Sequence, residues 1–175
     1  MTEQRFGGFW RRALAFFVDK IILFFVNLLV LFVGIFALWL GYSSSYSERF
    51  PEDILGSTIS FTIIYGLVVV LIHMLYFTYF HGTTGQTPGK MMLGLRVVRS
   101  TGEEMSLGIG FLRWVGYIVS TVFLWLGFVW IAFDGKKQGW HDKVAQTFVI
   151  RVERVAKDSL YPPGEKYLDK DREIL

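Results

Sequence analysis

An arginine and an aspartate near the start of the chain have the types and spacing to bind an ion or a proton in a membrane. Arg12, Ala15 and Asp19 lie three, four and seven positions apart, which places them on one face of a helix. The stretch that begins two positions after Asp19, residues 21–42, carries no formal charge. A carboxylate at the centre of such a span costs about 2.5–3.5 kcal/mol on insertion scales. Asp19 therefore needs a polar partner or a task.

Three interpretations of Asp19 stay open. It accepts hydrogen bonds from another segment and locks the helices together; it binds a monovalent cation or a proton; or it lies with Lys20 at the wet interface, and the span begins at Ile21. Arg12 and Asp19 are about 10 Å apart along a helix axis. Both side chains lean toward the helix N-terminus. We therefore expect a third group or water to link them, and not a direct ion pair. Ala15 is small, so a neighbouring helix could come close there.

Two aspartates that follow the last apolar stretch are further candidates. Asp142 is the predicted partner of Arg12 if the ends of the first and third apolar stretches meet, and Asp134 is the nearby alternative. The ordinary explanation of either residue is a helix cap or a solvated turn. His141 beside Asp142 is weak evidence for a metal site or a general base, because the other histidines show no ligand spacing.

His73 and Lys90 are secondary candidates. A histidine inside an apolar stretch can titrate near physiological pH and relay protons, although more often it only hydrogen-bonds within the bundle. Lys90 ends a glycine-rich segment, residues 82–90, that resembles a phosphate-binding loop at first sight. The match fails because Thr84 stands where that pattern needs glycine and Met91 where it needs serine or threonine. We predict a tight turn at the membrane surface, with Lys90 facing lipid headgroups.

Composition indicates a membrane protein. Of the 175 residues, 53% are hydrophobic and 19% charged, against about 45–50% and 25% in soluble domains. The net charge is +3, and the basic residues flank apolar stretches, which favours membrane orientation over nucleic-acid binding. Because there is no cysteine, disulfides and thiolate chemistry are excluded. No nucleophile–base set or nucleotide fingerprint is visible, so we expect no enzyme activity, no catalytic residue, no metal and no cofactor.

Three apolar stretches, residues 16–40, 57–80 and 114–133, are each long enough for one helical crossing. The connector at 43–56 is acidic, whereas the N-terminus and the connector at 81–113 are basic. The positive-inside rule places the basic segments in the cytoplasm.

The third stretch conflicts with that rule. A single crossing would export Lys136, Lys137 and Lys143 together with the polar tail, residues 153–175. A re-entrant passage, bent near Gly127 or at residues 120–121, would keep them inside, provided that protein or water covers the bend. Residues 95–99 and 147–152 both have the composition of short strands. If they pair, both ends of the third stretch lie on one side.

Three segments resemble the RDD family of bacterial membrane proteins: residues 8–19, 85–98 and 138–150, which together span about residues 6–152. The resemblance maps the family's arginine to Arg12, its first aspartate to Asp19 and its second to Asp142, with Asp134 nearby. Gln146 stands where the family pattern has glycine, which puts the local backbone geometry in question.

The expected fold is an all-α membrane protein: a helical transmembrane bundle with two firm spans, a third apolar segment that either crosses or re-enters, and a small cytoplasmic β element. Residues 1–152 form the RDD-like membrane domain and 153–175 a polar C-terminal tail. The expected location is the bacterial cytoplasmic membrane, with several passes and a cytoplasmic N-terminus.

The resemblance implies transport of an unidentified small ligand, or sodium–proton exchange as in some members. In the exchange hypothesis Asp19 holds the monovalent cation or proton, and Arg12 and Asp142 set its pKa and orientation. Three apolar stretches are few for a transport path, so transport predicts a homo-oligomer. The alternative is a non-transporting membrane scaffold or assembly partner, in which the arginine and aspartates are structural.

Overall fold

The computed structural model describes residues 6–44 and 51–152. Residues 45–50 of the acidic connector and the predicted tail, residues 153–175, lie outside this part of the chain. In chain order the elements are helices α1 (Phe9–Ser44), α2 (Pro51–Thr83) and α3 (Pro88–Met92), strand β1 (Leu95–Arg99), helices α4 (Leu107–Val122), α5 (Leu126–Phe133) and α6 (Trp140–Val144), and strand β2 (Thr147–Arg151). This arrangement confirms the predicted fold class.

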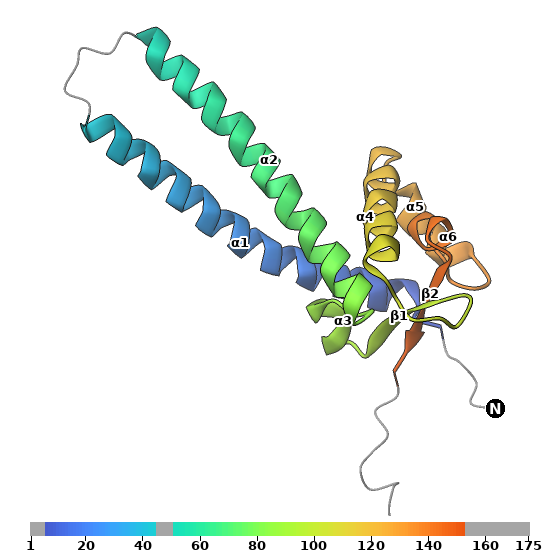
Figure 1. Ribbon diagram of the computed structural model, residues 1–175. Helices are drawn as coiled ribbons and strands as arrows, with labels where there is room; N and C mark the ends of the chain where they lie inside the picture. The colour runs from blue at the N-terminus through green and yellow to red at the C-terminus, as the bar shows by residue number, and fades with distance from the viewer. Residues whose placement is uncertain (1–5, 45–50, 153–175) are drawn as a thin grey trace, which may run out of the picture.

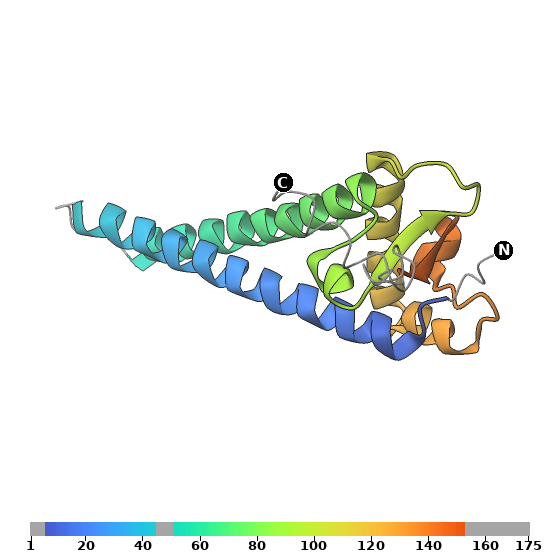
Figure 2. The same ribbon diagram turned by 90° about the horizontal axis from the view of Figure 1, so that it is seen from below.

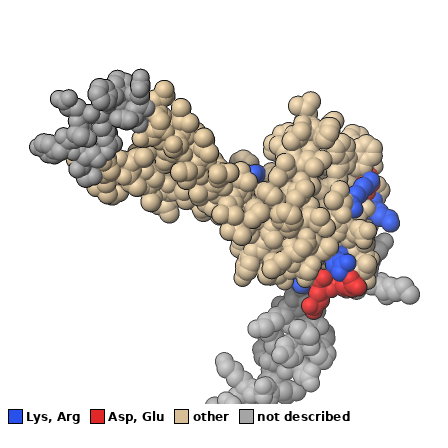
Figure 3. Space-filling model, turned by 45° about the horizontal axis from the view of Figure 1, so that its top comes forward, with Lys and Arg blue, Asp and Glu red and all other residues tan. Residues whose placement is uncertain are grey.

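Helices α1 and α2 form a long hairpin that projects from a smaller head made by the other elements (Figures 1 and 2). Within them, Phe9–Gly41 and Leu55–Thr83 are long and apolar enough to cross a membrane. The two helices contact each other where Gly34 leaves room for the ring of Phe61. In Figure 3 the described part of the hairpin shows almost no charged side chains on this face, whereas the head shows several. The hairpin is therefore the candidate membrane-spanning part.

The third apolar stretch is bent, as the charge pattern predicts, but the break lies at residues 123–125, between the two positions proposed for it. Helices α4 and α5 meet at 100°. The turn is made by Leu124 and Trp125, whose φ angles are 50° and 64°. Leu124 is 84% exposed at the tip. A bare apolar tip on a bent helix pair fits a segment that dips into the bilayer and returns.

Strands β1 and β2 pair antiparallel, with Leu95 opposite Arg151 and Arg99 opposite Thr147. Their inward residues Leu95, Val97 and Val149 are buried against Ala15 of α1. Because β1 precedes α4 and β2 follows α6, this pairing brings both ends of the bent segment together. The predicted strand pair is confirmed.

Helix α4 fits into the head through glycines. A Cβ at Gly110 would lie 2.5 Å from the carbonyl oxygen of Thr78 on α2, and one at Gly116 would lie 2.7 Å from the Cα of His141 on α6. Real Cβ atoms do not approach so closely, so only glycine permits this packing. The contacts press α4 between α2 and α6 and thereby position its arginine, Arg113.

Candidate functional site

Asp19 lies at the base of the hairpin and is fully buried. Its carboxylate accepts three hydrogen bonds, from the Tyr76 hydroxyl at 2.9 Å, the Thr87 hydroxyl at 2.5 Å and the backbone N–H of Gly89 at 2.8 Å. All three donors are uncharged. They come from α2 and from the start of α3, so this carboxylate ties three segments together. The interpretation of Asp19 as a wet interfacial residue is wrong.

The glycine-rich segment supplies two of those donors. Thr87 caps α3 with its side chain, and Pro88 takes the first helical position, where its missing N–H costs nothing. A Cβ at Gly89 would lie 2.1 Å from the carbonyl oxygen of Ala15. The predicted turn and the predicted close approach at Ala15 are thus confirmed, and the neighbour is the short helix α3.

Asp142 forms a second and different site. Its carboxylate pairs with Arg12 at 2.6 Å and with Arg113 at 2.6 Å, and it accepts the backbone N–H of Gly139 at 3.0 Å. Asp142 and Arg113 are fully buried and Arg12 is 7% exposed. The predicted pairing of Arg12 with Asp142 is confirmed, and Arg113 joins it.

The two arginines also hold the strands in place. Arg12 donates from Nε to the carbonyl oxygen of Gly7 at 2.9 Å, and Arg113 donates to the hydroxyl of Thr147. Burial by itself raises the pKa of Asp142, but the two guanidinium groups outweigh it and hold that pKa well below its usual range. Asp142 is therefore ionised at neutral pH.

Asp134 lies in the turn that follows α5, which is the ordinary explanation given for it above. It accepts N–H groups of Lys136 and Gln138 at 3.1 Å each and pairs with the half-exposed Lys143 at 2.7 Å. The hydrogen bond from Lys143 and those from the backbone lower the pKa of Asp134, against a smaller opposing effect of burial. Asp142, and not Asp134, is therefore the partner of Arg12.

The two candidate clusters are separate. Among the described residues, no hydrogen bond or ion pair joins Arg12 to Asp19, although both side chains lie on the buried face of α1. The expected absence of a direct bridge is confirmed. Instead of one linking group, each residue has its own partners from other elements.

The secondary candidates differ in environment. His73 hydrogen-bonds through Nδ1 only to the carbonyl of Val69 one turn earlier. The prediction that Lys90 faces lipid headgroups is wrong. The side chain is 6% exposed, and its Nζ lies 2.7 Å from Nε2 of His81. It points inward because the preceding residues bind Asp19 and turn the first face of α3 toward α1. Burial lowers the pKa of Lys90.

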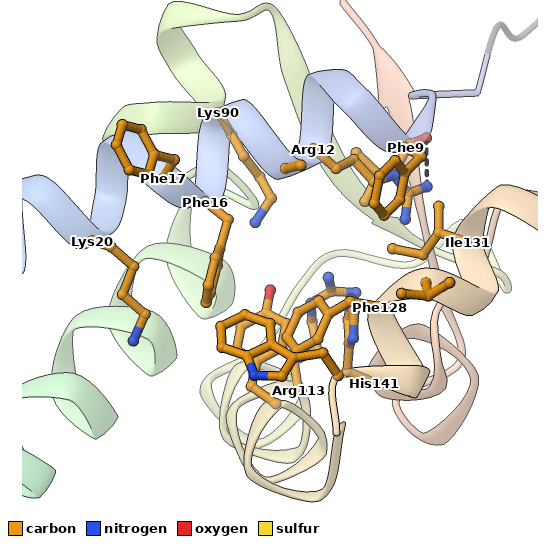
Figure 4. Close-up of a pocket in the computed structure, with 15 residues that line it drawn as sticks. Phe9, Arg12, Phe16, Phe17, Lys20, Lys90, Arg113, Phe128, Ile131 and His141 are labelled. Carbon is orange, nitrogen blue, oxygen red and sulfur yellow. Dashed lines mark hydrogen bonds between the residues drawn. The ribbon is translucent and has the colours of Figure 1, made fainter. Parts of the chain in front are cut away.

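A cavity of about 350 Å³ lies beside both clusters, between α1 and the bent pair α4–α5. In Figure 4, Lys90 and Phe16 point toward it from one side, and Arg113, Phe128 and His141 lie on the other. Most of its wall is aromatic or aliphatic. Four basic side chains reach it and no carboxylate does; the basic residues are Arg12, Lys20, Lys90 and Arg113.

His141 borders the cavity as a neutral group. Burial and the nearby cations lower its pKa to about 3, against the opposing effect of Asp142. Its Nδ1 has no hydrogen-bond partner among the described residues. Within the described residues, no group of three or more His, Cys, Asp or Glu is placed to hold a metal ion.

Sequence reasoning missed Arg113, Tyr76, Thr87 and His81. In the sequence Arg113 only ends the basic connector at 81–113, yet in the structure it is a buried partner of Asp142. An arginine just before a charge-free stretch, with a carboxylate after it, was the available signal. Tyr76 and Thr87 gave none, because uncharged hydroxyls at those positions are ordinary.

Gln146 keeps the backbone shape that glycine would favour. Its φ is 51°, in the left-handed region, at the turn between α6 and β2. The departure from the family pattern therefore leaves the geometry in place.

These features define a helical membrane protein with two candidate spanning helices, a bent apolar helix pair and an internal arginine–aspartate network. Residues 6–146 match the RDD family, and the chain belongs to it.

Two similar proteins come from Bacillus subtilis strain 168. "Uncharacterized protein YxaI" is 34% identical over 147 residues, which cover 82% of this chain and 96% of the relative. "Uncharacterized membrane protein YteJ" is 28% identical and covers 86% and 84%. The "Proline-rich antigen homolog" of Mycobacterium tuberculosis is 28% identical over 42% of this chain and 31% of its own length. No solved structure matches.

Proposed function

We propose that this RDD-family protein transports a small molecule, which it binds in the cavity between α1 and the α4–α5 bend. The observation that carries the proposal is the cavity itself: about 350 Å³, within the usual range for ligand sites, with mainly aromatic walls and a few buried polar groups. Both aspartate clusters lie behind its wall and hold the elements that form it. The protein has no catalytic role in this proposal.

The cavity is level with the base of the membrane hairpin. Phe16, Phe17 and Lys20 of α1 line it, and these residues belong to the first candidate span. A ligand would enter from the head side or from the membrane border. Two spans give little enclosure for a path, so transport requires at least two copies of the chain.

Cation–proton exchange at Asp19 is the second form of the transport hypothesis. All three groups that contact this carboxylate donate hydrogen bonds to it, whereas a monovalent cation needs acceptor oxygens. The hydroxyls of Tyr76 and Thr87 would have to turn their lone pairs toward the ion. The geometry therefore favours a structural role for Asp19.

A proteoliposome experiment separates these functions. Exchange of a fluorescently labelled single-chain amphiphile between leaflets is followed by dithionite quenching, and proton flux on addition of Na⁺ or K⁺ is followed with trapped pyranine. We expect faster amphiphile exchange than in empty vesicles, and Ala13→Trp, which fills the cavity wall, should return it to that baseline. If wild type matches empty vesicles in both assays, transport is excluded.

A non-transporting scaffold is the alternative function. It is favoured by the hairpin, whose exposed surface is apolar and has few contacts within the chain; Phe24, Phe32 and Leu67 are 61%, 73% and 66% exposed. In that case both assays stay at baseline, and Asp19→Asn changes only the folded yield.

We further propose the bacterial cytoplasmic membrane as the location, with the head and N-terminus in the cytoplasm. The basic segments 81–113 and 136–143 belong to the head, which supports this orientation. Because the chain lacks cysteine, Ser100→Cys in the head and Ser43→Cys at the far end of α1 can be labelled without background. Labelling of Ser43→Cys from the cytoplasmic side would contradict the proposed orientation.

A further inference from the structure

The charges around the cavity are unbalanced. Asp142 offers one negative charge to two guanidinium groups, and the hydrogen bonds to Asp19 come from uncharged donors. Two carboxylates therefore stand near four basic side chains, those of Arg12, Arg113, Lys90 and Lys20. Neither Lys90 nor Lys20 takes part in an ion pair found in the described residues. Lys20 is exposed and lies over the rings of Phe16 and Phe77, whereas Lys90 is 6% exposed. A buried charge without a charged partner is costly, so Lys90 calls for an anion.

Lys90 is the strongest sign of such an anion. Its neighbour His81 hydrogen-bonds through Nδ1 to the carbonyl oxygen of Phe77 at 2.8 Å, which requires a proton on Nδ1. Nε2 of His81 is then the acceptor of one Lys90 hydrogen at 2.7 Å. A lysine ammonium has three hydrogens. The other two have no acceptor in the hydrogen bonds of the described residues, while the amine points into the cavity (Figure 4).

Arg113 adds a second set of unused donors. It is fully buried, and its Nε and Nη2 atoms have no hydrogen-bond acceptor among the described residues. It borders the same cavity as Lys90. A single oxyanion placed between these two side chains would satisfy both, as charge-assisted hydrogen bonds do at phosphate and carboxylate sites.

The rest of the cavity is built for an apolar group. Phe16, Trp125 and Phe128 form one cluster of rings, with centroids 5.4–6.3 Å apart. Trp125 and Phe17 are also 50% and 61% exposed, on the surface that belongs to the membrane region. The aromatic wall thus continues from the basic end of the cavity toward lipid.

We propose that the cavity binds an anionic amphiphile, with its phosphate or carboxylate group on Lys90 and Arg113 and its hydrocarbon chain along Phe16, Trp125 and Phe128. The assignment names the ligand class of the proposed function. A role of this ligand in transport rests on the proposed function, whereas its binding does not. A lipid headgroup and a free anion share the same oxyanion chemistry, so the experiment must distinguish them.

The test uses the full chain in a neutral maltoside detergent and native mass spectrometry of bound probes. Decyl phosphate, inorganic phosphate and decyltrimethylammonium are titrated separately. We expect one saturable decyl phosphate site, at least tenfold weaker binding of inorganic phosphate, and no saturable binding of the cationic amphiphile. Equal affinity for both amphiphiles, or equal affinity for inorganic and decyl phosphate, would overturn the assignment.

Matched variants locate the site. Lys90→Met removes the charge at nearly constant length, and Ala13→Trp fills the wall; each should weaken decyl phosphate binding at least tenfold, whereas the exposed control Lys136→Met should not. If Lys90→Met does not fold, Lys20→Met at the more open end takes its place, with a smaller loss expected. Unchanged binding in the folded variants contradicts the proposal.

The two proposals can fail separately. Binding without leaflet exchange would exclude only transport, and exchange without charge-selective binding would exclude only this assignment.

Discussion

The two buried aspartates are held by different kinds of donors. Asp142 pairs with two guanidinium groups, whereas Asp19 is held by two hydroxyls and one backbone N–H. Both carboxylates are fully buried. Asp19 joins α1 to α2 and α3, and Asp142 joins α6 to α1 and α4. Loss of charge at Asp142 leaves two arginines without their ion-pair partner, whereas Asp19 has no ion-pair partner among the described residues. The two sites should therefore respond differently to the same substitution.

Asp142→Asn should have the largest effect. It leaves Arg12 and Arg113 buried without a counter-charge, and breaking a buried ion pair typically costs about 3–5 kcal/mol. We expect that loss in the free energy of unfolding, measured by urea denaturation in detergent, or failure to fold. The control is Asp134→Asn at the exposed pair, which should change stability by less than about 0.5 kcal/mol. Similar costs for both variants would contradict the network.

Gly89→Ala should come next. The added methyl group would lie 2.1 Å from the Ala15 carbonyl oxygen and force α3 away from α1. Overpacking of this kind costs about 1–3 kcal/mol, and the Gly89 hydrogen bond to Asp19 would be lost with it. The matched control is Gly135→Ala, which meets nothing within 4 Å. Thermal unfolding of the two variants measures the difference, and equal midpoints would rule out the close contact.

Asp19→Asn should cost less than Asp142→Asn. The amide keeps one acceptor oxygen for Gly89 and Tyr76, and the Thr87 hydroxyl can rotate to accept from the new NH₂ group. We expect a loss of about 1–2 kcal/mol in the free energy of unfolding. A loss as large as that of Asp142→Asn would show that the charge of Asp19 itself is required, and would favour an ion-binding role.

Acidification should weaken the Asp142 region through His141. The pKa of His141 is lowered to about 3 in the folded protein, from an ordinary value near 6.5. The unfolded chain therefore binds the extra proton first, so stability falls as pH drops from about 6.5 toward 3. His141→Gln should flatten that part of the curve of unfolding midpoint against pH. A curve of unchanged slope would disprove the assignment.

Gln146→Gly should have the smallest effect and the opposite sign. A left-handed backbone costs a residue with a side chain about 1–2 kcal/mol, which glycine avoids, although glycine loses part of that gain through the entropy of the unfolded chain. We expect a gain of up to about 1 kcal/mol in unfolding free energy. Ala145→Gly, next to it at negative φ, should instead destabilise.

The sequence by itself determined the membrane class, the two spanning helices and the short strands. In lipid, the backbone N–H and C=O groups of an uncharged stretch must be paired within the protein, and a helix pairs them within the stretch itself. This constraint acts locally along the chain. Helical spacing also placed Arg12, Ala15 and Asp19 on one buried face. The charge pattern predicted a bent third segment, since Lys136, Lys137 and Lys143 would otherwise be exported.

Only the tertiary structure decided which donors meet which carboxylate. Arg113 reaches Asp142 because Gly110 and Gly116 let α4 press against α2 and α6, and Lys90 turns inward because Thr87 and Gly89 are bound to Asp19. The cavity and its surplus of basic groups arise in the same way, from segments as far apart along the chain as Phe9 and Val149. Such contacts depend on packing between elements, and periodicity within one element contains no information about them.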